Sequence, residues 1–162
     1  MTIIHIPGTV GERRLHFTIG PPGCGKTTLA QTFLQQPKRA VVSLDGLRHA
    51  LFNGKRAFWD NPTEERRWLV RKAYDAMCYD LRERTDWDIM LPNTNLDPWF
   101  WDHAQMCFYQ WDIVVHIFDD VPLKTLLERG AQRPVEDKIS PEVITEYYER
   151  FIAHDAYWRS LK

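Results

Sequence analysis

One short stretch of this chain has residue types and spacing that can hold a phosphate chain, the pattern GxxxxGK[ST]. Residues without a Cβ let successive backbone N–H groups turn toward an anion beside a helix N-terminus. Lys26 adds a point charge for the outer phosphate oxygens, and the Thr27 hydroxyl can ligate the Mg²⁺ that phosphates bring. A glycine-rich turn with a chance Lys-Thr pair is the alternative. The nucleotide-binding residues that the pattern predicts are Gly20, Pro21, Pro22, Gly23, Cys24, Gly25, Lys26, Thr27 and Thr28.

The surrounding sequence predicts the elements that must position this loop. Residues 15–19 alternate as a strand does, and residues 26–35 carry apolar side chains at helical spacing. Further β-rich runs, each separated by helical sequence, cover residues 40–44, 89–92 and 113–118. This rhythm predicts an α/β fold, with a mostly parallel sheet of about four to five strands covered on both faces. Residues 1–14 are expected to form an N-terminal arm or an edge strand.

The longest helix is expected at about residues 63–85, with one apolar side in the core. The residues expected to be buried there are Leu69, Ala73, Ala76 or Met77, and Leu81. Proline after a capping residue, at Asp97-Pro98 and Ser140-Pro141, predicts two further helix starts.

Length and composition limit the class of protein. With 162 residues, 44% of them hydrophobic, the chain is expected to form a single domain. A formal charge of −1 excludes a generally basic nucleic-acid coat, so any polyanion must be held by a local patch. Three cysteines without a CxxC pair argue against a disulfide framework and a zinc site. No apolar run approaches the roughly 20 residues of a membrane span, and a cytoplasmic location is expected.

Asp45 and Arg48 follow the second β-rich run, at the edge of the sheet where ligands bind in open α/β folds. A carboxylate there can accept the proton of an attacking hydroxyl, and a guanidinium one helical turn later can hold a substrate phosphate. Asp45 can also coordinate Mg²⁺, directly or through water. The alternative is a helix cap at Asp45 with a solvated Arg48.

Arg129 and Arg133 lie one turn apart after the last strand, in a region of about residues 121–140. Two arginines near the phosphates can neutralise the charge that develops on a transferred group and can close as a lid. A surface helix with paired charges, Glu128 among them, is the alternative.

Together these motifs resemble the bacteriophage polynucleotide 5′-hydroxyl kinase domain, a member of the P-loop kinase superfamily. The resemblance spans about residues 15–155 and rests on the order and spacing of four segments. They are the phosphate loop, Leu44-Asp45-Gly46-Leu47-Arg48, Asn93-Thr94-Asn95-Leu96-Asp97-Pro98, and Val121-Pro122 through Arg133.

The resemblance implies a role for each matching residue. Asp45 looks like the general base and Arg48 like the ligand of the acceptor phosphate. Arg133 looks like the main lid arginine on the donor phosphates, with Arg129 beside the nucleotide. Thr94 and Asn95 lie where the family lines its pocket. At Asn93 the chain departs from the family, which usually carries an acid there.

The acceptor is expected to contact a basic aromatic loop at residues 53–60, with Trp59 as the stacking residue. The seven tryptophans can alternatively fill the core. The leading hypothesis is transfer of the γ-phosphoryl group of ATP, with Mg²⁺, to a 5′-hydroxyl end of DNA or RNA. Its rivals are a hydroxymethylated pyrimidine in phage DNA, a small nucleoside or sugar as acceptor, and a non-catalytic nucleotide switch.

Overall fold

The computed structural model, which describes residues 1–9, 13–84 and 86–161, contains a five-stranded sheet in the order β1-β5-β2-β4-β3. The strands are β1 (Thr2–Ile6), β2 (Arg14–Ile19), β3 (Arg39–Val41), β4 (Asp88–Leu91) and β5 (Asp112–Ile117). β2 is central and pairs in parallel with both β4 and β5, while β1 runs antiparallel along the outer edge of β5. The α/β fold is therefore confirmed, and within residues 1–14 the segment Thr2–Ile6 forms an edge strand; residues 10–12 of the expected arm lie outside the described part.

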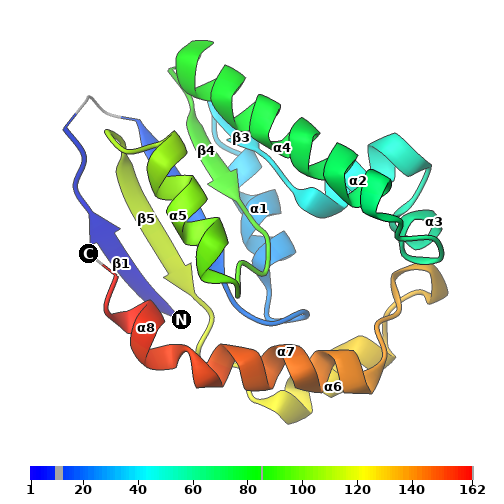
Figure 1. Ribbon diagram of the computed structural model, residues 1–162. Coiled ribbons are helices and arrows are strands. Elements are labelled where there is room, and N and C mark those ends of the chain that lie inside the picture. Colours follow the sequence, from blue (N-terminus) through cyan, green and yellow to red (C-terminus); the bar gives the residue numbers. More distant parts are fainter. Residues whose placement is uncertain (10–12, 85, 162) are drawn as a thin grey trace.

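Helices cover the sheet on both faces (Figure 1). α4 (Glu64–Arg84) and α5 (Pro98–Cys107) cover one face, and α1 (Lys26–Leu34) covers the other. The remaining helices are α2 (Leu44–Phe52), α3 (Lys55–Trp59), α6 (Leu123–Ala131), η1 (Val135–Asp137), α7 (Pro141–Ala153) and α8 (Asp155–Arg159). In the described residues, no helix combines the length and the apolar character that crossing a bilayer requires.

Alternation along the strands decides which side chains reach which layer. Leu15, Phe17 and Ile19 of β2 point to α4 and α5 and are fully buried. Met90 of β4 points the other way and packs with Phe33 of α1. The central strand is therefore apolar on the side of α4 and α5, whereas on the side of α1 its His16 packs against Phe33.

The buried side of α4 differs from the expectation. Its core side chains are Val70, Tyr74 and Cys78, each at most 3% exposed, whereas Leu69 and Met77 are each 41% exposed. The helix carries two apolar stripes, and the stripe that contains Tyr74 and Cys78 faces the sheet. The prediction was wrong for Leu69 and for Ala76 or Met77, because a tyrosine and a cysteine were not counted as anchors of the core; Leu81 packs against the core as expected.

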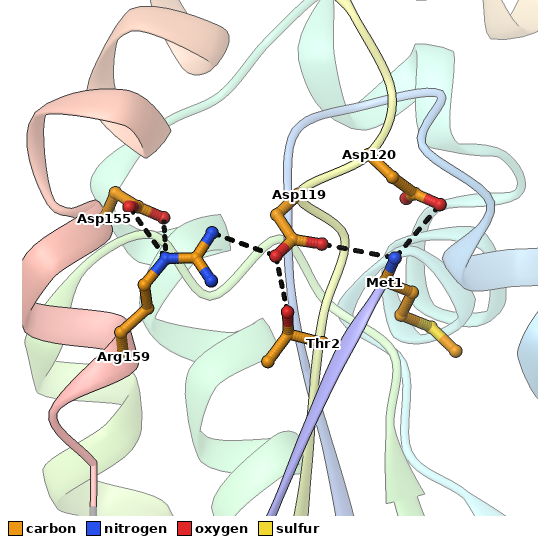
Figure 2. A network of polar contacts seen from close by, with 6 residues as sticks. All are labelled: Met1, Thr2, Asp119, Asp120, Asp155 and Arg159. Carbon is orange, nitrogen blue, oxygen red and sulfur yellow. Dashed lines mark hydrogen bonds and ion pairs between the residues drawn. The ribbon is translucent and has the colours of Figure 1, made fainter.

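A polar network joins both ends of the chain to the loop after β5 (Figure 2). Asp119 accepts a hydrogen bond from the Thr2 hydroxyl (2.6 Å) and pairs with the Met1 amine (3.2 Å) and with Arg159 of α8 (3.0 Å). Burial alone would raise the pKa of Asp119, but these donors lower it to about 2. The network thus anchors Asp119, at the start of the segment that leads from β5 into α6.

The face of the sheet that α1 covers also holds a polar pair. His16 Nδ1 of β2 lies 3.0 Å from His116 Nε2 of β5, and their other ring nitrogens are buried without a hydrogen-bond partner. Burial lowers the pKa of His16 to about 3 and that of His116 to about 4. Both rings are therefore neutral at physiological pH.

Candidate active site

The phosphate loop joins the carboxyl end of β2 to α1. Gly23 (φ 89°) and Gly25 (φ 118°) both adopt backbone conformations that favour glycine. A Cβ on Gly20 would lie 2.9 Å from both Cys24 Sγ and Phe118 Cβ, so that position has no room for a side chain. Gly25 begins α1 without a side-chain cap, which leaves the first N–H groups of the helix available to an anion. The loop therefore fits a bound phosphate chain.

Lys26 is folded back onto this loop. Its Nζ donates to the carbonyls of Gly20 and Pro21, both at 2.8 Å, and its side chain is 8% exposed. Burial lowers the pKa of Lys26, and the charge of Arg133 lowers it further, while Cys24 and Asp45 act in the opposite sense. The ammonium also contacts Cys24 Sγ (3.4 Å), and it can exchange these neutral partners for phosphate oxygens.

Asp45 lies in the first turn of α2, which follows β3 after a short connection and has Ser43 as its N-cap residue. The Ser43 hydroxyl accepts from the Gly46 N–H (3.3 Å), so the capping residue is Ser43. Asp45 is thus not the helix cap, and its carboxylate is 55% exposed.

Arg48 is held by three contacts rather than solvated. Its Nη1 lies 2.6 Å from Asp45 Oδ1, and its guanidinium lies 5.2 Å from the ring of Phe58 and 4.8 Å from that of Trp59. Phe58 is 1% exposed and Trp59 is 49% exposed. The base candidate, the phosphate-ligand candidate and an exposed indole therefore form one cluster, in which sequence reasoning missed Phe58.

The loop from β4 to α5 fixes this cluster relative to β2. Asn93 Oδ1 accepts from the Leu44 N–H (2.9 Å), which ties the start of α2 to the loop. Asn95 is fully buried and donates to the Thr18 carbonyl (2.8 Å), and Gly20 N donates to the Thr94 carbonyl (3.2 Å). The Asn95 side chain thus supports the loop backbone, and the half-buried Thr94 is the more accessible of the two.

The two expected lid arginines both lie at the phosphate loop. Arg129 Nη1 donates to the Gly23 carbonyl (2.9 Å), and a Cβ on Gly23 would lie 3.7 Å from Arg133 Nη2. Both arginines therefore contact or closely approach the phosphate loop, which argues against the alternative of a surface helix whose charges face only water. The structure adds an ion pair that the sequence did not indicate, between Lys55 of α3 and Asp137 of η1 (2.5 Å). This pair links the expected acceptor loop to the lid region.

The expected metal ligands, Thr27 and Asp45, are both exposed and lie on different helices. Among the described residues, no group of three or more His, Cys, Asp or Glu side chains could hold a metal ion. The residues fit a Mg²⁺ that arrives with the phosphates, for which Thr27 would supply a hydroxyl ligand and Asp45 a second-sphere carboxylate.

Comparison with protein families gives one assignment. A family model described as an AAA domain matches residues 15–154. A comparison with curated protein sequences finds no significant match.

Comparison with solved structures finds matches that include a chain of an RNA repair complex and small-molecule kinases. A chain of the Pnkp1/Rnl/Hen1 RNA repair complex superposes with a TM-score of 0.75 at 19% identity over 92% of this chain. This chain spans less than half (47%) of the length of that one. Shikimate kinase from Bacteroides thetaiotaomicron superposes with a TM-score of 0.55 at 18% identity. The match covers 90% of this chain and 80% of the shikimate kinase chain. A gluconokinase from Sinorhizobium meliloti superposes with a TM-score of 0.50 at 14% identity, and the match covers 96% of this chain and 98% of the gluconokinase chain. At these identities the likeness shows the fold alone, an α/β fold that this chain shares with these proteins.

Proposed function

This chain belongs to the AAA domain family, and on that premise we propose that it transfers the γ-phosphoryl group of ATP to the 5′-hydroxyl end of a nucleic acid. One observation carries the proposal: an exposed carboxylate, a guanidinium and an indole are joined at Asp45, Arg48 and Trp59, on the edge of the sheet that bears the phosphate loop. A nucleotide switch needs the loop but has no use for this cluster.

The donor half of the reaction depends on the phosphate loop and the lid. The loop amides and Lys26 hold the phosphates of ATP, and Arg133 neutralises the charge that develops as the bond to the leaving ADP breaks. Mg²⁺, held through Thr27, supplies further charge neutralisation when bound. Arg129 keeps its link to the Gly23 carbonyl and so holds the lid on the loop.

The acceptor half depends on Asp45. The oxygen of the acceptor hydroxyl forms a bond to the γ-phosphorus, and its proton passes to the Asp45 carboxylate. In the structure Arg48 occupies one oxygen of this carboxylate. A nucleotide phosphate attracts the same guanidinium in a two-pronged hydrogen bond. Acceptor binding therefore frees the base, so that proton acceptance is coupled to the presence of a phosphate-bearing acceptor.

The polynucleotide acceptor is favoured by what surrounds Arg48. The Arg48 side chain is only 18% exposed and its guanidinium lies over the half-exposed Trp59 ring, so a phosphate and a neighbouring base can be held at once. The highest TM-score among the comparisons above also belongs to a chain of an RNA repair complex. Hydroxymethylated pyrimidine in DNA is a variant of the same polymer acceptor.

A small hydroxyl compound is the second candidate, and the coverage of the comparisons favours it. Shikimate kinase and gluconokinase are matched over 80% and 98% of their chains, against 47% for the RNA repair protein. A small acceptor would use Arg48 for a carboxylate or phosphate and would leave Trp59 unused.

Transfer of label from γ-labelled ATP separates these candidates. We expect label on a single-stranded 5′-hydroxyl oligonucleotide and none on the same strand with a 5′-phosphate. Asp45→Asn should lose transfer, while Asp86→Asn should keep it, because Asp86 is a comparably exposed aspartate that pairs with Lys38 but precedes β4, at the other end of the strands. Labelling of shikimate or gluconate, without labelling of the oligonucleotide, would favour a small hydroxyl compound as the acceptor over a nucleic acid. Absence of labelling on every hydroxyl compound would refute the kinase proposal.

A further inference from the structure

A column of stacked side chains lies outside the site described above, where α4 meets α5. The Arg71 guanidinium lies 4.0 Å from the centroid of the Trp99 ring, and that ring stacks on His103 at 5.0 Å and 26°. His103 Nε2 in turn lies 3.1 Å from Asp75 Oδ1 of α4. The column is therefore anchored at its inner end and ends outward in an exposed, planar cation.

A second pair of the same kind lies one turn away on α4. Trp68 is 58% exposed, and Lys72 Nζ lies 5.9 Å from its ring. Residues 64–72 carry four cations and two carboxylates, in a chain whose formal charge is −1. The surface thus combines exposed indoles with a local excess of positive charge, which is the chemistry of a single-strand binding surface.

Both ends of this surface are tied to elements of the proposed acceptor site. Arg66, at the start of α4, donates to the Ala57 carbonyl of α3 (2.9 Å), and α3 carries Trp59. Trp99 opens α5 directly after the Thr94 loop, and the Asp97 side chain caps its N–H (2.9 Å). Arg66 and Arg71 are about 7.5 Å apart along the helix axis at 1.5 Å per residue. α4 therefore bridges the acceptor cluster and the stacked column.

We infer that Arg71, Trp99, Trp68 and Lys72 bind the nucleotides that follow the 5′ end of a single-stranded acceptor. The inference rests on the proposed function and adds to it a preference for acceptors several nucleotides long. A base stacks on the outer face of the Arg71 guanidinium, as bases do on arginine planes in RNA recognition. Lys72 pairs with a backbone phosphate as a point charge.

The test compares the acceptor KM of a 5′-hydroxyl dinucleotide with that of a single strand of about ten nucleotides. Wild type should have a lower KM for the longer strand. Arg71→Ala should raise that KM about 5- to 100-fold, the range expected for loss of one stacked base, and should leave the dinucleotide KM and both kcat values unchanged. Arg71→Lys, which keeps the charge but not the plane, should recover only part of the loss.

Arg150 gives the matched control, because it is an exposed arginine that stacks on an aromatic ring (Tyr147, 5.5 Å) of α7. Arg150→Ala should behave as wild type with both acceptors. Equal KM values for the two acceptors in wild type, or equal effects of Arg71→Ala and Arg150→Ala, would overturn the inference while leaving the kinase proposal intact. No transfer to either acceptor by wild type would instead refute the proposed function.

Discussion

Acidification is expected to destabilise the fold through the buried His16–His116 pair. In the unfolded chain each imidazole has a pKa of about 6.5. In the folded protein burial lowers that of His16 to about 3, with the charges of His116, Arg39 and Arg14 acting in the same sense. Burial lowers that of His116 to about 4, and His5 adds to the effect. As the pH falls, protons therefore bind the unfolded chain first.

The sign and size of the effect follow from these values. The stabilising contribution is fully present above about pH 6.5 and is lost as the pH falls toward the folded-state pKa values. Between pH 6.5 and pH 5 each histidine loses about 2 kcal/mol, at about 1.36 kcal/mol per pH unit. The pair together loses about 4 kcal/mol, a large part of the roughly 5–15 kcal/mol that stabilises a typical domain.

Urea unfolding at pH 7.5 and pH 5 measures this loss, with tryptophan fluorescence as the signal. The variant that combines His16→Gln with His116→Gln cannot titrate at these positions and should lose much less between the two pH values. His103, whose pKa burial also lowers, remains in that variant and accounts for a residual loss of the same sign. Equal stability of wild type at both pH values, or an undiminished loss in the double variant, would refute the argument.

Three further changes test the site. Asp45→Asn should lower kcat by about 10²- to 10⁴-fold without loss of stability, as judged by labelled-phosphate transfer and thermal unfolding; an unchanged kcat would remove Asp45 from the chemistry. Lys26→Ala should lower kcat/KM for ATP by about 10²- to 10³-fold and weaken ADP binding in calorimetry. Unchanged values of both would show that the lysine serves only the loop carbonyls. Because Lys55 and Asp137 form one ion pair, Lys55→Ala and Asp137→Ala should change the acceptor KM equally, and the double variant should add nothing; additive effects would show two independent roles.

Local patterns in the sequence were sufficient for the elements of the fold. The alternation of residues 15–19 and the glycines of the phosphate loop predicted the β2–α1 connection, because strand pleat and positive φ act within a few residues. The capping residues Asp97 and Ser140 likewise begin α5 and α7 as expected.

Features that depend on distant partners were not predictable in the same way. The choice between the two apolar stripes of α4 depends on what the sheet presents to Tyr74, and periodicity alone does not contain that information. The ion pair of Lys55 with Asp137 joins residues 82 positions apart in the sequence, because the chain fold brings η1 of the lid region against α3. Asp45 and Arg48 were expected to share a pocket, yet only the structure shows that they neutralise each other.

The central claim is that an acceptor hydroxyl meets Asp45 while ATP is held by the phosphate loop. A crystal structure with a non-hydrolysable ATP analogue and a 5′-hydroxyl oligonucleotide tests it most directly. We expect the Asp45 carboxylate within about 2.6–3.2 Å of the acceptor hydroxyl, Arg48 on the acceptor phosphate, and Lys26 moved from the Gly20 carbonyl to the analogue's phosphates. An acceptor hydroxyl that lies beyond reach of Asp45, with Arg48 still paired to that carboxylate, would contradict it.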